Sequence, residues 1–363
     1  MARAAKLPLA QAAAAEAARL RVRRPSWVWV AAASAFLLAA MLTGLLVGPV
    51  DIGVGAVVEA AASHLPFLGV KSHLSAEESA ILWQLRLPRV VLACLVGAML
   101  ASAGATYQGV FRNPLADPYL LGVAAGAGLG ATLAIAYAPG TALGGDLLPF
   151  AAFAGGAAAV VLAYALGRSS GASRGPAALV LSGVTVTAFM TAIQTFIQQQ
   201  HSDTLQAVYS WILGRLDTAG WHDVLLLLPY AAVSGTALLL HRRLLDVLAL
   251  GDDEAASLGV NVGRVRIVLV AAATLGTAAA VAVSGLIGFL GIIVPHGVRL
   301  VAGGSYRVVL PLSLVVGAGF LVFVDVVGRT ALSPAEVPIG VVTAFFGAPF
   351  LAVILRTSRL VGP

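Results

Sequence analysis

The chain has 363 residues, of which 60% are apolar and only 10% are charged, and its mean hydropathy is +0.95. A water-soluble globule of this size needs more polar surface, so these values exclude a soluble fold and indicate a membrane protein. The net charge of +6 and the pI near 9.9 fit basic loops that face anionic lipid, and we assign no nucleic-acid role to them. The single cysteine, Cys94, excludes an intrachain disulfide and a cysteine-based metal site.

Residues 1–26 are rich in Ala and Arg, but the apolar run after them is too long for a signal peptide and lacks a clean cleavage site. We expect a basic cytoplasmic tail there, followed by a retained first span. Each crossing of a ~30 Å hydrocarbon core takes about 20 helical residues, and the absence of strand-like alternation favours a helical bundle over a barrel. The predicted spans are 27–47, 87–109, 119–138, 147–168, 177–198, 222–242, 265–284, 286–301, 307–327 and 338–356.

These spans predict one all-α, polytopic membrane domain of about ten transmembrane helices over residues 27–356, with a C-terminal tail at 357–363. Its orientation follows from the basic residues, because cytoplasmic loops carry the excess of arginine and lysine. With the N-terminus inside, most of the 22 basic residues fall on the cytoplasmic side. Both termini are therefore predicted to be cytoplasmic.

Several kinds of chemistry are disfavoured by the residues present. A P-loop needs a lysine after its glycine-rich turn, and neither Lys6 nor Lys71 stands in such a setting. The six histidines are scattered singly, and the predicted spans hold no carboxylate cluster, although Asp325 stands near the end of the ninth span. We therefore expect no ATP hydrolysis by this chain and no metalloprotease activity, and an energy source, if there is one, must lie on a partner.

The second span is entered through LRLPR, in which Arg86 and Arg89 stand three residues apart on the outer side. This spacing predicts a pair on one helix face that points outward; the alternative is two snorkelling arginines that anchor a helix end. At the other end of the span, Pro114 and Pro118 break the chain within FRNPLADP. Irregular backbone at membrane depth is tolerated only under protein or in a water-filled cavity, so this loop is predicted to lie at a pathway.

Later spans carry further polar and small residues. Gly122, Gly126 and Gly130 recur every four residues and predict close helix packing. Gln194 and Gln198 lie one turn apart near the outer end of the fifth span, where polarity is less costly beside a cavity than beside lipid.

The connection 242–266 is the longest on the cytoplasmic side. Asp252, Asp253 and Glu254 follow Gly251, which suits the first turn of a short helix, and Gly259 is placed to end it. A short exposed helix between two spans can serve as a handle for a partner; the alternative is a solvated loop whose acids balance nearby arginines.

An internal repeat is also suggested. RVVL begins at Arg89 and RIVL at Arg266, at equal distances before Pro118 and Pro295, in segments that cross the membrane in opposite directions. This pattern hints at an inverted repeat.

Four stretches together carry a resemblance to a known family. They are LRLPRVVLACLVGAMLASAGATYQGVFRNPLADPYLL (85–121), LALGDDEAASLGV (248–260), SGLIGFLGIIVPHGVRL (284–300) and AEVPIGVVTAFFGAPF (335–350). The combination resembles the FecCD-type permeases, the membrane subunits of binding-protein-dependent ABC importers for cobalamin, haem and iron-siderophores.

The resemblance implies roles for particular residues. It implies docking of a periplasmic binding protein at Arg86, Arg89 and Arg329, the last of these in DVVGRTAL. It implies a cytoplasmic gate at Asn113 and Leu115, with a second gate loop at Pro176 and Ala177 that departs from the small hydroxyl residues often found there. It implies pathway-lining roles for Gln194 and Gln198. Within the segment 244–262, it implies coupling to the ATPase through Leu250, Gly251, Asp252, Asp253, Glu254, Ser257, Leu258 and Gly259.

The resemblance also implies an assembly in a bacterial inner membrane. It consists of two copies of this chain, two cytoplasmic ATPase subunits that bind ATP and Mg, and one periplasmic binding protein. No cofactor is expected in the chain itself, and it is expected to be a transport subunit rather than an enzyme. We expect haem as the cargo, with an iron-siderophore second and cobalamin third. The alternatives from other classes are an ion-coupled secondary carrier that uses Asp325 and a scaffold or sensor without transport.

Overall fold

The computed structural model describes residues 27–48, 50, 52–63, 67, 73–138, 147–169, 176–217 and 220–359. The predicted N-terminal tail at 1–26 lies outside these residues. Of the predicted C-terminal tail, residues 357–359 continue the last helix and the remainder lies outside the described part of the chain.

Each of the ten predicted spans corresponds to a helix, and the all-α prediction is confirmed. The helices are α2 (Trp27–Leu46), α5 (Leu87–Phe111), α6 (Val123–Tyr137), α7 (Leu147–Ser169), α8 (Pro176–Gln200), α10 (Trp221–Leu248), α12 (Val262–Ser284), α13 (Leu290–Ala302), α14 (Tyr306–Thr330) and α15 (Ile339–Arg359). Among the described residues, seven helices are long and apolar enough to cross a membrane, whereas α6, α13 and α15 count as shorter apolar helices.

Two predicted spans begin too early. The span predicted from 119 starts with the 3-10 turn η2 (Pro118–Leu121), and α6 begins only at Val123. The span predicted from 286 starts with irregular backbone, and α13 begins at Leu290. Glycines with positive φ explain the difference. Gly122, between η2 and α6, has φ 86°, and Gly285, before residues 286–289, has φ 70°, and such values interrupt a right-handed helix.

Shorter elements lie between the long helices. They are α3 (Val54–Ser63), α4 (Ala76–Ala80), the π-helical turn η1 (Ile81–Arg86), η4 (Ser202–Thr204), α9 (Leu205–Ile212) and α11 (Asp252–Ser257). Local signals account for several helix starts. Ser75 and Glu78 form a capping box at α4, and the Asn261 side chain accepts a hydrogen bond from Arg264 N at the start of α12.

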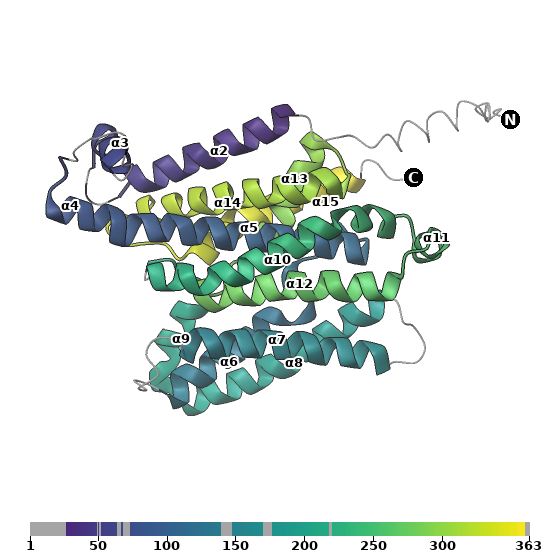
Figure 1. Cartoon of the computed structure of the whole chain (residues 1–363). Helices are drawn as coiled ribbons and strands as arrows, with labels where there is room; N and C mark the ends of the chain where they lie inside the picture. The colour runs from purple at the N-terminus through teal and green to yellow at the C-terminus, as the bar shows by residue number, and fades with distance from the viewer. Residues whose placement is uncertain are drawn as a thin grey trace.

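The long helices lie lengthwise in one bundle (Figure 1). At one end of this bundle lie α3, α4 and α9, and at the other end α11 projects beyond the long helices. The first residues of α2 and the last residues of α15 point toward the α11 end. If that end is cytoplasmic, as the distribution of basic residues predicts, both ends of the membrane domain lie on the cytoplasmic side.

Helix α5 is the centre of the bundle, and most of its residues from Pro88 to Phe111 are buried. It approaches its neighbours through glycines. A Cβ atom added to Gly97 would lie 2.3 Å from Gly317 O on α14, and one added to Gly104 would lie 2.1 Å from Gly291 O on α13. Such backbone-to-backbone contacts are typical of small-residue packing between membrane helices.

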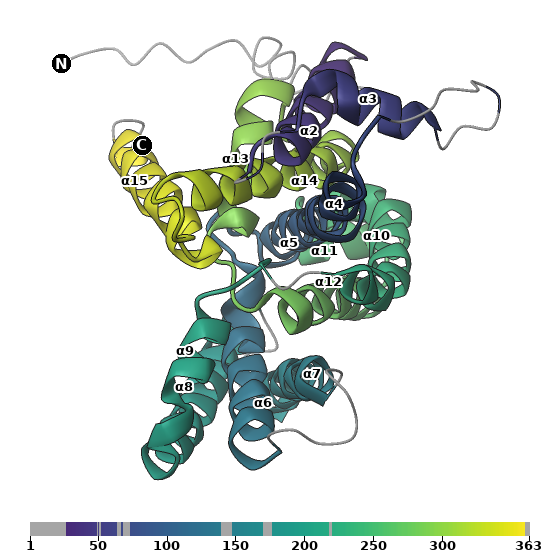
Figure 2. The ribbon, with the colours of Figure 1, turned by 90° about the vertical axis from the view of Figure 1, so that its left-hand side faces the viewer.

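Helices α6, α7, α8 and α9 form a second group beside the helices around α5 (Figure 2). The predicted glycine packing is confirmed here. Gly126 and Gly130 of α6 face α7, where added Cβ atoms would lie 2.2 Å from Gly155 O and 2.0 Å from Ala151 O. Gly122 has a different role, because its left-handed conformation begins α6.

The inverted repeat stays a prediction, and the course of the chain fits it. Helices α5 and α12 run in opposite directions along the bundle (Figure 1). Each is followed by irregular backbone and then by a shorter helix, α6 or α13.

Candidate functional site

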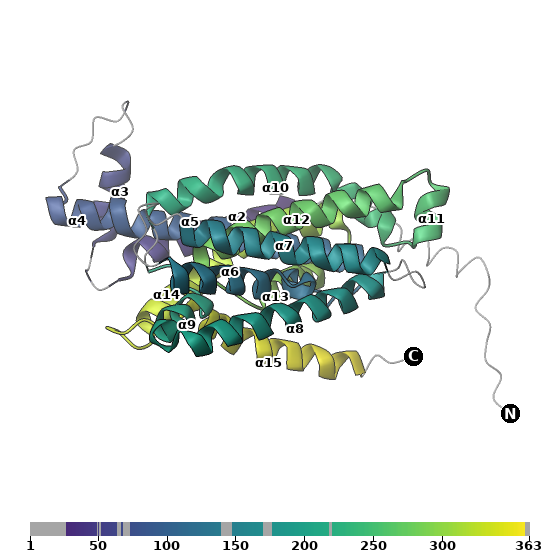
Figure 3. The same cartoon turned by 90° about the horizontal axis from the view of Figure 1, so that it is seen from below.

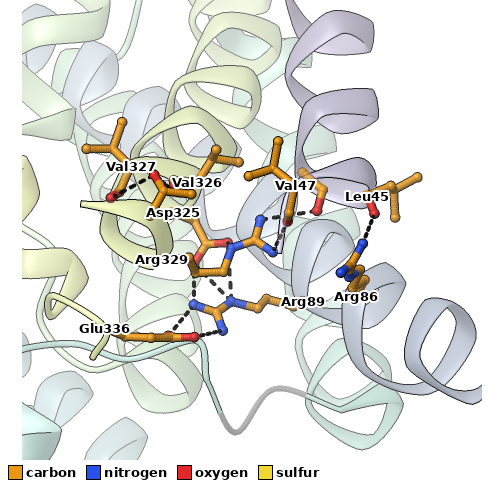
Figure 4. Close-up of polar contacts among 11 residues, drawn as sticks. Leu45, Val47, Arg86, Arg89, Asp325, Val326, Val327, Arg329 and Glu336 are labelled. Atoms are coloured by element: carbon orange, nitrogen blue, oxygen red, sulfur yellow. Dashed lines mark hydrogen bonds and ion pairs between the residues drawn. The ribbon is translucent and has the colours of Figure 1, made fainter. Parts of the chain in front are cut away.

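A cluster of charges, all but one of them largely buried, lies at the end of the bundle opposite α11. Arg89 on α5 lies between Asp325 on α14 and Glu336 in the loop after α14 (Figure 4). Its Nη2 atom is 2.8 Å from Asp325 Oδ1 and 2.7 Å from Glu336 Oε2. Arg329 lies one turn after Asp325 on α14, and its Nε atom is 3.1 Å from Asp325 Oδ2. The Asp325 side chain is only 3% exposed, so it is paired with two cations in a setting of low polarity.

Arg86 and Arg329 hold the end of α2. Arg86 is 5% exposed, and its Nη1 atom donates hydrogen bonds to Leu45 O at 2.8 Å and Leu46 O at 3.0 Å. Arg329 donates to Val47 O at 3.2 Å and to Gly44 O at 3.1 Å. The last carbonyls of a helix lack partners within it, so these guanidinium groups satisfy the C-terminal end of α2.

The expectation that Arg86 and Arg89 point outward on one helix face is therefore wrong. Arg86 turns toward the end of α2, whereas Arg89 turns toward α14, and both side chains are largely buried. The physical reason is that each guanidinium finds acceptors within the chain, namely unpaired carbonyls for Arg86 and carboxylates for Arg89.

A polar cavity of about 210 Å³ lies beside this charged cluster. Arg89, Asp325 and Glu336 line it from one side, and Arg215 and Asp217 contribute further charges. Two of these carboxylates were not among the predicted site residues, namely Glu336 in the AEVPIG motif and Asp217 in the segment after α9. A carboxylate in an apolar motif and a charged pair in GRLD are signals that could have identified them.

The geometry around Asp325 bears on the secondary-carrier alternative. Its Oδ1 atom accepts hydrogen bonds from Arg89 Nε and Nη2, and its Oδ2 atom lies close to Arg89 Nε and Arg329 Nε. An acid that relays ions or protons must exchange its partners, whereas this one is held by two arginines. The arrangement favours a structural role for Asp325.

The interrupted loop at the α11 end is held by side-chain hydrogen bonds. Arg112 ends α5 with φ 51°, and Asn113 Oδ1 accepts a hydrogen bond from Leu115 N at 2.9 Å. Gln108 donates to Gly291 O at 3.0 Å, and Arg299 donates to the Gln108 side-chain oxygen. Residues 112–115 of the loop are exposed, whereas the residues that follow pack against protein, with Ala116 and Pro118 buried.

A second contact joins this loop to the break between α12 and α13. The hydroxyl of Tyr119 donates to Ile287 O and accepts from Ile287 N, both at 3.0 Å. Gln108 makes a parallel link, because Gly291 belongs to α13. The two interrupted segments are therefore hydrogen-bonded to each other.

The predicted gate residues lie toward the same end of the bundle. Asn113 and Leu115 are exposed on the loop after α5, and Leu115 is 37% exposed. Pro176 and Ala177 form the start of α8, which packs on η2 through Gly183. Ala177 is exposed, and the side chain of Pro176 lies outside the described residues.

The predicted short helix in the connection between α10 and α12 is confirmed as α11. Gly251 with φ 137° precedes it and Gly259 with φ 80° follows it, with the three acids in its first turn. Asp252 ties it to the bundle through Arg112 at 3.1 Å and Arg266 at 3.0 Å. Figure 1 shows α11 projecting from the bundle. The segment is helical rather than a loop, but its Asp252 does balance Arg266, as the alternative expected, so the role of α11 as a handle stays a prediction.

The surface of this helix combines apolar and polar groups. Leu250 and Leu258, which flank α11, are 52% and 63% exposed, whereas Ala255 is fully buried against the bundle. Ser257 donates to Glu254 O at 2.7 Å and closes the last turn. The segment thus presents exposed leucines beside acids on a helix that is anchored to the bundle.

The two predicted pathway glutamines differ in position. Gln194 is 8% exposed and packs against α6, where a Cβ atom added to Gly128 would lie 3.0 Å from its Oε1 atom. Gln198 is half-buried. The opposite, exposed side of α8 carries apolar residues such as Leu181 and Phe189. Gln194 thus lies in the interface between α6 and α8.

Comparison with known proteins identifies the family of the chain. Residues 36–357 match the model of a family described as the FecCD transport family. The chain belongs to the FecCD transport family. The resemblance seen in the four sequence stretches is therefore confirmed. FecCD proteins are multi-pass membrane permeases of ABC importers for iron chelates, cobalamin, hemin or siderophores, and these importers work with ATPase and binding-protein partners.

Curated FecCD relatives are similar over most of their length. The chain is 38% identical to a permease of Bacillus subtilis (strain 168) described as an uncharacterized ABC transporter permease, covering 93% of this chain and 96% of the relative. It is also 38% identical to the cobalamin import system permease protein of Halobacterium salinarum, covering 92% and 96%. The hemin transport system permease protein of Yersinia pestis is 37% identical, covering 75% and 82%.

A solved structure agrees with the FecCD fold. It is described as an inward-facing conformation of a metal-chelate type ABC transporter, and it has a TM-score of 0.78 and 29% sequence identity with this chain. The match covers 90% of this chain and 98% of that one.

Proposed function

We propose that this FecCD protein is the permease of an ATP-driven importer that carries haem across a bacterial inner membrane. In this proposal two copies of the chain assemble with two cytoplasmic ATPase subunits, which bind the ATP and Mg, and with one periplasmic binding protein. The observation that carries the proposal is α11, a short anchored helix with exposed Leu250 and Leu258 at the predicted cytoplasmic end of a FecCD bundle.

The cargo is supported by similarity alone. Haem is favoured by the general likeness of the motifs to haem-type permeases and by the 37% identity to the hemin permease of Yersinia pestis. Cobalamin, which the motifs placed third, moves to second, because the permease from Halobacterium salinarum is 38% identical over a larger share of this chain. An iron chelate is the third, since probable iron chelatin permeases of Helicobacter pylori are also similar.

The proposed docking end is the charged cluster with its cavity. Arg89 and Arg215 line the cavity and would supply the positive charge that meets carboxylates of a binding protein, with Arg89 exchanging its exposed partner Glu336 for one of them. Arg86 and Arg329 do not contact the binding protein in this proposal. They support the docking surface by holding the end of α2 beside it. Charge pairs at such an interface chiefly govern orientation and association rate.

The proposed motion begins at α11. A shift of α11 in an ATPase cleft would move Asp252. Through one ion pair this would move Arg112, which lies beside the gate residues Asn113 and Leu115. Through the other it would move Arg266 in α12. Pro176 and Ala177 form the second gate segment of the proposal. Gln194 and Gln198 would contribute to the pathway once the interface between α6 and α8 opens.

Two measurements test the proposal. The assembled complex in proteoliposomes should accumulate haem only with internal ATP, and the same vesicles should be offered cobalamin and a ferric siderophore. Accumulation of one of the other cargoes instead would correct the substrate and leave the architecture in place.

The coupling role has a matched pair of variants. Leu258→Glu places a charge on the exposed side of the α11 segment and should abolish co-purification of the ATPase. Val54→Glu changes a residue of similar exposure, 61% against 63%, on α3 at the other end and should leave co-purification unchanged. Equal recovery of the ATPase with both variants would contradict the assignment of α11.

A further inference from the structure

An apolar groove runs along the side of the bundle between α7 and α12. It has a volume of about 550 Å³ and is lined from α7 by residues that include Ala157 and Val161, and from α12 by residues that include Ala271 and Leu275. Figures 1 and 3 both show α7 beside α12. In Figure 2 these two helices lie on the side of the molecule away from α8 and α15.

The groove becomes polar toward the α11 end. A second cavity of about 300 Å³ shares Tyr164, Arg168 and Ile267 with the groove and adds Arg266 and Gly263 of α12. The apolar slot therefore opens into a pocket that carries two arginines. Because this is the end predicted to face the cytoplasm, the arginines are expected at the height of the lipid headgroups.

Both arginines have donors to offer an anion. Arg168 is exposed, stacks its guanidinium 5.8 Å from the Tyr164 ring centroid, and has no carboxylate partner among the described residues. Arg266 is 9% exposed and gives one nitrogen, Nη2, to Asp252, but its Nε atom is buried without a hydrogen-bond partner. A buried guanidinium nitrogen without an acceptor is costly. Because Arg266 lines the pocket, a rotation of its side chain toward the pocket would let a phosphate oxygen satisfy that nitrogen.

The dimensions of the groove suit an acyl chain. Its α7 lining extends from Phe153 to Arg168, which at a helical rise of 1.5 Å per residue is about 22 Å. One leaflet contributes about half of a ~30 Å hydrocarbon core. The groove is thus long enough to hold a chain across the whole leaflet on the α11 side.

We propose that this groove is a binding site for an anionic phospholipid. The phosphate lies between Arg168 and Arg266, and an acyl chain lies along the apolar lining of α7 and α12. Basic pockets between membrane helices on the cytoplasmic side are suited to anionic headgroups. The site also touches the coupling machinery, because the guanidinium of Arg266 that faces the lipid is the one that holds Asp252 of α11.

The headgroup part of the proposal is tested by lipid titration of the purified, delipidated protein, read by native mass spectrometry. Phosphatidylglycerol and phosphatidylcholine with identical acyl chains are the probes. Arg168→Gln should bind phosphatidylglycerol about fivefold more weakly, since one surface arginine contributes about that factor toward anionic lipid. Arg243→Gln removes an exposed arginine of α10 at the same end of the bundle and should bind phosphatidylglycerol as the parent does.

The apolar part is tested by filling the groove. Ala157→Phe places a ring in the slot and should lower the binding of phosphatidylglycerol at least as much as Arg168→Gln does. Ala158→Phe adds the same ring at the next, exposed position, which does not line the groove, and should have no such effect. Helical content and elution volume verify that both variants are folded.

Three results would overturn the proposal. The first is equal phosphatidylglycerol binding by Arg168→Gln and Arg243→Gln. The second is phosphatidylcholine binding as tight as that of phosphatidylglycerol. The third is a loss of dimer rather than of lipid in Ala157→Phe, which would mean that a second copy covers the groove. The assay measures lipid binding without transport, so its result tests the lipid site independently of the proposed cargo.

Discussion

Replacement of Asp325 by asparagine should destabilise the protein far more than replacement of Glu336 by glutamine. Both carboxylates bind Arg89, but the Asp325 side chain is 3% exposed and also binds Arg329, whereas the Glu336 side chain is 40% exposed. Removal of one member of a buried ion network leaves an uncompensated charge and costs about 3–5 kcal/mol. An exposed pair contributes about 0–1 kcal/mol. Asp325→Asn should therefore lower the free energy of unfolding by at least ~2 kcal/mol more than Glu336→Gln does.

The assay is reversible unfolding of the purified protein in mixed micelles, with the two single variants measured side by side. A double-mutant cycle of Asp325→Asn with Arg329→Gln should show a coupling energy of about 0.5–3 kcal/mol, because the side chains share one network. If Asp325→Asn costs no more than Glu336→Gln, or if the cycle gives no coupling, the charges do not act as a buried network and this interpretation of the cluster is refuted.

Three further outcomes are expected. Arg86→Met should remove charge-assisted hydrogen bonds to the end of α2, each contributing about 1.5–3 kcal/mol, and should speed amide exchange around residues 45–47; unchanged exchange there would contradict the capping role. Gly104→Ala should destabilise the bundle by about 1–3 kcal/mol through overpacking, because its Cβ atom would lie 2.1 Å from Gly291 O, whereas Gly297→Ala meets nothing within 4 Å and should be tolerated in the same unfolding assay. Asp252→Asn should weaken both contacts that anchor α11 and lower ATP-driven uptake more than ATPase binding, whereas a parallel loss of both would point to misfolding of α11.

The features that the sequence predicted well are those fixed by local signals. The ten helices follow from apolar runs long enough to cross a bilayer, and α11 follows from acids placed between Gly251 and Gly259. Hydropathy did not predict the late starts of α6 and α13. The residues before both helices are apolar, but Gly122 and Gly285 with positive φ lie among them and interrupt the helix. Hydropathy reports burial in lipid and does not report backbone conformation.

The features that the sequence did not predict depend on contacts between distant segments. Arg86 finds Leu45 O, 41 positions away, and Arg89 finds Asp325, 236 positions away. A pair of arginines at a helix entry has the same local appearance whether the side chains point to solvent or to such acceptors. Gln194 is similar, since only the packing of α6 on α8 brings Gly128 against its amide.

The hydrogen bonds between the two interrupted segments have a consequence for how such a protein can change shape. Three of them join Gln108 and Tyr119 to Gly291 and Ile287, away from bulk water. Separation of the segments would leave several buried polar groups unsatisfied, at about 1–3 kcal/mol for each group. Movement of both segments together has no such cost. We therefore expect the segments before α6 and before α13 to move together when the protein changes shape, because moving one without the other would break these hydrogen bonds.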